Sequence, residues 1–166
     1  MKYKTETPKQ PGILLPASDY IFCVREMTCG IQSGGKTSGS DFFEMELEIE
    51  GKGATVREKL IAHDSTGWKI NNFIQCAGIV IPEGGEFEFR QDIAEQSGCT
   101  WVNPIGLRGH CALVIETYAK RSDPDYPNTK TQHMTGKKNK VAVFYTDRPK
   151  LPPNESLRVV ASPDDF

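Results

Sequence analysis

The sequence predicts a mainly β domain with five antiparallel strands and one helix between the third and the fourth strand. Three observations support this prediction. Residues Ser40 to Glu50 alternate apolar and acidic side chains with a period of two, which is typical of a strand with one buried and one solvent-exposed face. A turn signal and a second alternating stretch follow directly. A segment with helical spacing, from about Thr66 to Ala77, precedes two later strands.

The first strand is predicted at residues 20–27, after a polar start that we expect to be a loose arm. Its apolar side chains are Tyr20, Phe22, Val24 and Met27. The stretch from Gly30 to Ser40 is rich in glycine and serine, so we expect a flexible connection there.

The second and third strands are expected to form a hairpin. The turn is Gly51-Lys52-Gly53, and the third strand runs from Ala54 to Ile61. Arg57 and Lys59 share one side of it and are expected opposite the glutamates of the second strand, in cross-strand pairs of about 0.2–1 kcal/mol each. The apolar set of the second strand is Phe43, Met45, Leu47 and Ile49.

The helix is expected to be capped by Asp64 or Ser65 and closed by Gly78. Prolines and glycines then recur through residues 79–106 and interrupt any regular secondary structure there. Within this segment, residues 87–94 fit either a strand or a short helix.

The fourth strand is predicted at 107–118, a long polar connection at 119–139 and the last strand at 140–146. In the last strand, Val141, Val143 and Tyr145 are expected on one face and Ala142 and Phe144 on the other. This order of elements is that of an OB-fold, a partly open Greek-key barrel. The predicted organisation is an N-terminal arm at 1–13, an OB-fold-like domain at 14–148 and a C-terminal tail at 149–166.

The composition indicates a cytoplasmic globular protein. The chain has 166 residues, a formal net charge of −2 and a pI near 5.9, which excludes a uniformly basic nucleic-acid coat but not a local basic patch. We find no signal-peptide pattern and no apolar run of the ~20 residues needed to span a bilayer. Five cysteines without a Cys-x-x-Cys pair suggest reduced thiols.

Residues Gly30 to Thr37 fit the phosphate-loop pattern G-x-x-x-x-G-K-T. That pattern binds phosphate because the loop opens a helix, whose backbone N–H groups and dipole attract the anion. Here Ser38-Gly39-Ser40 and then an alternating strand follow, which argues against a helix. A nucleotide hydrolase or kinase is therefore the less favoured alternative, and it requires a helix after Thr37.

The connection before the last strand is locally basic and carries interleaved aromatic residues. Basic side chains follow a phosphate backbone, and aromatic rings stack unpaired bases. The expected phosphate contacts are Lys36, Arg57, Lys59, Lys120, Arg121, Lys130, Lys137, Lys138 and Lys140. The expected stacking residues are Phe42, Trp68, Tyr118, Tyr126 and His133, with Trp68 also fitting the core. The alternative is a structural or protein-interaction β domain whose basic loop is only solvated.

Several segments resemble phage-encoded single-stranded-DNA-binding proteins. They are Leu15–Tyr20, Phe42–Gly51, Trp68–Gly78 and Gly106–Gly109, and the ending Asp164-Asp165-Phe166 is similar to the acidic, Phe-terminated tip of bacterial and phage single-strand binders. The resemblance implies a non-catalytic protein of phage or prophage DNA replication or recombination, without cofactor, metal or membrane contact. It also implies that replication or recombination proteins bind Asp164, Asp165 and Phe166, and it leaves homo-oligomerisation open.

The exposed face of the second strand is a row of glutamates, Glu44, Glu46, Glu48 and Glu50. We therefore expect that DNA does not lie flat along this strand. Either Arg57 and Lys59 neutralise the row, or the loops at the rim of the groove make the contacts.

Overall fold

The computed structural model describes residues 13–81, 87–91 and 101–158. Five strands form one antiparallel sheet in the order β3-β2-β1-β6-β7, and two short strands pair in parallel. The elements are β1 (Ser18–Ile31), β2 (Asp41–Ile49), β3 (Ala54–Ile61), α1 (Gly67–Cys76), β4 (Glu88–Phe89), β5 (Trp101–Val102), β6 (Arg108–Ala119), β7 (Thr135–Phe144) and a 3-10 turn at Glu155–Leu157. The predicted mainly β class, the five antiparallel strands and the intervening helix are confirmed.

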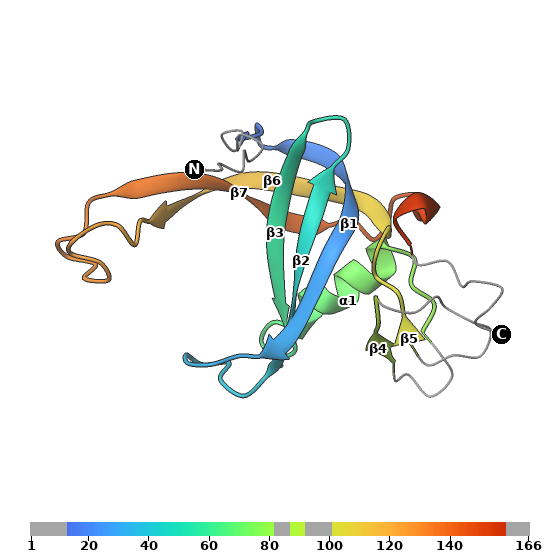
Figure 1. Cartoon of the computed structure of the whole chain (residues 1–166), viewed down its shortest axis with the longest axis horizontal. Coiled ribbons are helices and arrows are strands. Elements are labelled where there is room, and N and C mark those ends of the chain that lie inside the picture. Colours follow the sequence, from blue (N-terminus) through green and yellow to red (C-terminus); the bar gives the residue numbers. More distant parts are fainter. Residues whose placement is uncertain (1–12, 82–86, 92–100, 159–166) are drawn as a thin grey trace, which may run out of the picture.

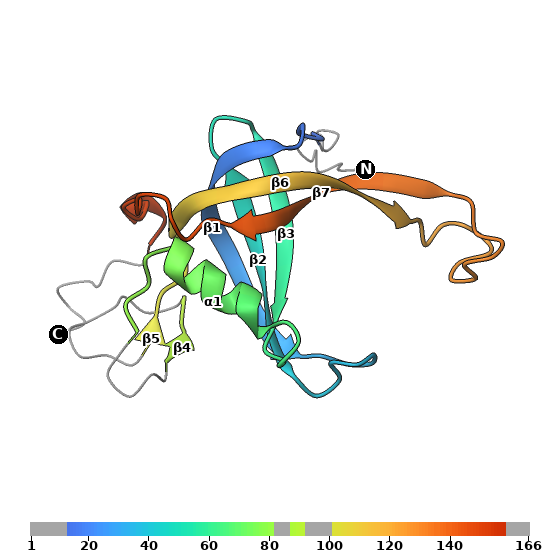
Figure 2. The same ribbon diagram turned by 180° about the vertical axis from the view of Figure 1, so that it is seen from behind.

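Strand β1 joins the two halves of the sheet. Its first part pairs with β6 from Ser18 to Cys23, and its second part pairs with β2 as far as Ile31. The register shifts between Val24 and Glu26, and such a bulge bends a strand and increases its twist. Figures 1 and 2 show the result, with β1, β2 and β3 crossing the direction of β6 and β7. The first strand is longer than predicted because both neighbours extend it.

The sheet is not closed. Strands β3 and β7 are its outer strands, and no hydrogen-bonded ladder joins them in the described part of the chain. Helix α1 lies across this open side, below β7 in Figure 2. The barrel expected from the sequence is therefore not confirmed, because the edges of β3 and β7, the third and fifth strands of the sheet, are not joined.

Helix α1 covers the core through Phe73, which is fully buried. Its ring lies 5.3 Å from that of Phe144 on β7 and 6.1 Å from that of Phe43 on β2, measured between centroids. The helix approaches β6 closely because Gly109 has no side chain; a Cβ there would lie 2.6 Å from the sulfur of Cys76. One helix thus packs against both halves of the bent sheet.

The β2–β3 hairpin confirms the alternation read from the sequence. All four predicted apolar residues of β2 are buried. In the register of the hairpin, Glu44 lies opposite Lys59 and Glu46 opposite Arg57. The buried face follows directly from the period of two along the strand.

The predicted helix cap is wrong. Thr66 occupies the N-cap position, and its hydroxyl donates a 2.7 Å hydrogen bond to the carbonyl of Ile61 instead of capping the helix. Ser65 is engaged by His63, whose Nδ1 lies 2.8 Å from the Ser65 hydroxyl and accepts from the Ser65 N–H at 3.2 Å. The chain therefore turns once more before the helix begins.

The last strand also differs from its prediction. It begins at Thr135 rather than at 140, so Lys137 and Lys138 belong to a strand and not to a loop. Val141 and Phe144 are both buried while Val143 is exposed, contrary to the simple alternation. The reason is a register shift that leaves Ala142 as an extra residue, because Leu113 pairs with Val141 and the preceding residue pairs with Val143.

Two further segments complete the body. Residues 88 and 89 form the short strand β4, which agrees with the strand alternative for 87–94, and 92–94 lie outside the described residues. Residues 150–158 run back along the body, where the N–H of Asn154 donates to Gly106 O at 2.8 Å and Arg158 donates to Asn103 O at 3.0 Å. Among the described residues, no helix has both the length and the apolar character needed to cross a bilayer.

Candidate nucleic-acid interface

The hairpin of β6 and β7 extends beyond the body of the sheet as an arm, seen to the left in Figure 1. Within the described residues, the side chains of Lys137 and Lys140 have no hydrogen-bond or ion-pair partner, and both residues are exposed. Lys138 lies with its ammonium group 5.6 Å from the centre of the Tyr118 ring. These lysines stand on a regular strand, so their charges have fixed positions along the arm.

The tip of the arm, residues 120–134, is held in shape by Asp123. Its carboxylate is buried and accepts hydrogen bonds from the backbone N–H groups of Met134 (2.8 Å), Asp125 (3.0 Å) and His133 (2.7 Å). These donors stabilise the ionised carboxylate and lower the pKa of Asp123 from 3.8 to about 2. This part of the long polar connection expected at 119–139 is therefore a folded loop, and it carries the exposed side chains of Lys120, Arg121, Tyr126, Lys130 and His133.

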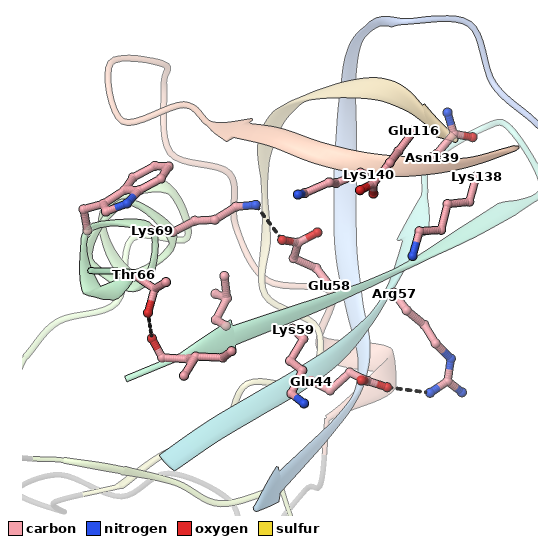
Figure 3. Close-up of a pocket in the computed structure, with 13 residues that line it drawn as sticks. Glu44, Arg57, Glu58, Lys59, Thr66, Lys69, Glu116, Lys138, Asn139 and Lys140 are labelled. Carbon is pink, nitrogen blue, oxygen red and sulfur yellow. Dashed lines mark hydrogen bonds and ion pairs between the residues drawn. The ribbon is translucent and has the colours of Figure 1, made fainter. Parts of the chain in front are cut away.

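A groove lies between the open edges of β3 and β7 and the start of α1, with a volume of about 690 Å³. Figure 3 shows Lys138 and Lys140 pointing from β7 into this space, with Glu58 and Lys59 below them on β3. Five of the fourteen DNA-contact residues predicted from the sequence line this groove. They are Arg57, Lys59, Trp68, Lys138 and Lys140.

The floor of the groove contains a buried ion pair that the sequence analysis missed. Lys69 Nζ donates to Glu58 Oε1 at 2.6 Å and to the carbonyl of Val141 at 2.8 Å. The helix thereby bridges β3 and β7 where no backbone ladder does. In the sequence, Glu58 falls on the same side of the strand as Ala54, Val56 and Leu60. This position could have indicated the ion pair, because a carboxylate on a buried face requires a partner.

The glutamate row on the outer face of β2 is largely neutralised. Arg57 lies 3.0 Å from Glu44 and 3.9 Å from Glu46, which confirms its part in the expected neutralisation by Arg57 and Lys59. Lys59 pairs with no glutamate of the described residues, so its expected part is wrong there; its ammonium group lies 4.1 Å from the centre of the Phe42 ring.

Arg25, at the bulge of β1, completes this neutralisation and was not foreseen. Its guanidinium lies 3.4 Å from the Glu48 carboxylate. Arg108 makes two hydrogen bonds to the Glu50 carboxylate, at 2.5 and 2.8 Å. The carboxylate beside Arg108 raises the pKa of the arginine, so its guanidinium stays charged.

Lys36 is separated from the arm. It lies in the exposed β1–β2 loop, and Figures 1 and 2 show this loop and the tip of the arm projecting from different parts of the molecule. After Thr37 the chain makes a turn and enters β2, so no helix follows the glycine-rich loop. The requirement of the nucleotide-hydrolase alternative is not met.

Asp123, Asp125 and His133 bring three metal-binding atoms within 4.8 Å of one another. The oxygens of Asp123 already accept three backbone hydrogen bonds. The three side chains therefore lie close together because of how the loop folds, and their proximity is not evidence of a metal site.

The predicted partner-binding residues Asp164, Asp165 and Phe166 lie outside the described residues.

No protein-family model matches this chain, and a search of curated proteins finds no match either.

Proposed function

We propose that this protein is a non-catalytic single-stranded-DNA-binding protein. The observation that carries the proposal is the arm, where exposed lysines and one arginine, none paired with an acid among the described residues, lie together with two exposed tyrosines. Such a surface fits a phosphate backbone whose bases are free to stack. The members of this set are Tyr118, Lys120, Arg121, Tyr126, Lys130, Lys137, Lys138 and Lys140.

The order of the sheet supports the same proposal. With its five strands numbered along the chain, the order is 3-2-1-4-5 and the helix follows the third strand. This order agrees with that of an OB-fold, except that in the described part of the chain no ladder joins the third and fifth strands. OB-folds commonly bind oligonucleotides with their strands and with the connection between strands four and five, which here is the tip of the arm.

A gel shift with an oligothymidine tests the proposal. We expect binding at 50 mM salt that weakens steeply at 200 mM, because neutralised phosphates release counterions. We also expect weaker binding to a duplex of the same length. Absence of a shift at low salt, or equal affinity for the duplex, contradicts the proposal.

The biological setting is also a proposal, supported by the resemblance to phage single-strand binders. In that setting the protein acts in the cytoplasm during phage or prophage DNA replication or recombination. Asp164, Asp165 and Phe166 then recruit a replication or recombination protein. Deleting these three residues should abolish that recruitment and preserve DNA binding; a loss of DNA affinity would contradict this role.

A further inference from the structure

The groove between β3, β7 and α1 has the size of a small-molecule site. Its volume of about 690 Å³ lies within the roughly 300–1,000 Å³ usual for such sites. It is open because the sheet lacks a ladder between its outer strands.

Trp68 lines this groove and is not used by the core. It stands in the first turn of α1, while the buried residues of that helix are Phe73, Ile74 and Cys76. The exposed fraction of Trp68 is 57%, high for the largest aromatic side chain. An indole in this position offers a flat face to a planar ligand.

The groove has a basic excess. Five basic and three acidic side chains line it. Two of the acids are already paired, Glu58 with Lys69 and Glu44 with Arg57. Among the described residues Lys140 has no partner, and Lys138 contacts only the Tyr118 ring. The third acid, Glu116, lies opposite Lys138 in the register of β6 and β7. An anion therefore meets two accessible ammonium groups and one carboxylate here, and it displaces no internal ion pair.

We propose that this groove binds one unpaired nucleotide, with its base stacked on Trp68 and an adjacent phosphate held by Lys138 and Lys140. This inference rests on the proposed function, and it adds the place on the protein where one base of the bound strand is held. The combination of a planar group and an anion fits a nucleotide and does not fit an acidic peptide that lacks an aromatic residue. A duplex cannot enter in the same way because its bases are already stacked, so the site favours single strands.

The test compares an oligothymidine with an abasic oligomer of equal length, which has the same phosphates and no bases. In the full chain, Trp68→Ala weakens oligothymidine binding roughly five- to 150-fold, the range for one stacked base. It leaves abasic binding unchanged within about twofold. Trp68→Phe recovers most of the affinity, since a phenyl ring also stacks. Lys140→Ala weakens the binding of both oligomers, whereas Lys52→Ala, in the β2–β3 turn, weakens neither.

Tryptophan fluorescence supplies a second readout, because the chain has only two tryptophans, Trp68 and Trp101. Saturation with oligothymidine quenches the emission of Trp101→Phe, in which Trp68 alone remains. It leaves the emission of Trp68→Phe unchanged.

Failure of the inference is distinct from failure of the proposed function. If the wild type binds oligothymidine and Trp68→Ala binds it equally well, the groove assignment is overturned while DNA binding stands. An equal loss for both oligomers, or quenching of Trp68 by a polyglutamate peptide instead of oligothymidine, also overturns the assignment. If the wild type binds no oligomer at low salt, the proposed function itself is overturned.

Discussion

The outer face of β1, β2 and β3 and the arm of β6 and β7 are both charged β surfaces, but their charges are organised differently. On the outer face, Glu44, Glu46 and Glu48 have arginine partners from neighbouring strands. On the arm, Lys137 and Lys140 have none within the described residues. The outer face is thus compensated internally, whereas the arm has a charge excess available to a ligand.

The two surfaces share one packing arrangement, in which an aromatic ring covers a glycine of the neighbouring strand and a lysine lies over the ring. They therefore differ mainly in how their charges are paired. Phe42 covers Gly30, where an added Cβ would lie 2.8 Å from the ring, and Lys59 lies over the ring. In the arm, Tyr118 covers Gly136 and has Lys138 over its ring. An aromatic ring, a cross-strand glycine and a lysine therefore occur in both regions.

The largest expected effect is on stability and comes from the ion pair below the groove. Lys69→Met should lower the free energy of unfolding by about 3–5 kcal/mol, because it leaves the Glu58 carboxylate buried without its partner. Urea denaturation measures this loss. The double variant Lys69→Met with Glu58→Leu should recover most of it. A loss below about 1 kcal/mol in the single variant would show that the pair is solvated.

The next effect is on binding and comes from the arm. Replacing Lys137, Lys138 and Lys140 by alanine should weaken oligothymidine binding roughly 100-fold at 0.1 M salt, since each lost phosphate contact removes about a factor of five. The slope of log affinity against log salt should fall by about 2. Fluorescence anisotropy across a salt series measures both quantities. Lys52→Ala is the matched control, and an unchanged slope in the triple variant would refute the role of the arm.

A smaller, local effect concerns pH at the tip of the arm. The pKa of Asp123 is lower in the folded loop than in an unfolded chain, so protonation favours the unfolded loop. The stabilisation is complete above about pH 4 and is lost as the pH falls toward 2. The protection factors of the His133 and Met134 amides, which are relative to the exchange of an unfolded chain at the same pH, should therefore fall over this window, while those of the β2–β3 hairpin stay high. Asp123→Asn should show fast exchange already at neutral pH; protection equal to the wild type would contradict this account.

The smallest effect is expected on the compensated outer face. Arg57→Ala should change the free energy of unfolding by less than about 1 kcal/mol, because its ion pairs with Glu44 and Glu46 are largely exposed. The slope of affinity against salt should stay unchanged, since Arg57 is already paired. A decrease in slope as large as that of one arm lysine would place Arg57 among the phosphate contacts and remove the contrast between the two surfaces.

Local pattern was sufficient for much of the fold. The alternation in β2 identified its buried face, and Gly51-Lys52-Gly53 identified the hairpin turn. Both depend on neighbouring residues along the chain, which is the information a sequence carries most directly. The bulges at Arg25 and Ala142 were not predicted. A bulge depends on how two strands pair, and a single extra residue does not produce a repeating pattern in the sequence.

For the candidate site, the sequence alone determined which side chains are basic or aromatic and that they gather late in the chain. Only the tertiary structure decided which of them meet. It placed Trp68, Lys138 and Lys140 around one groove and left Lys36 in a separate loop. It also placed Lys69 between Glu58 and the Val141 carbonyl. The physical reason is that the groove forms between the third and fifth strands of a bent sheet, and spacing along the chain does not encode which strand edges face each other.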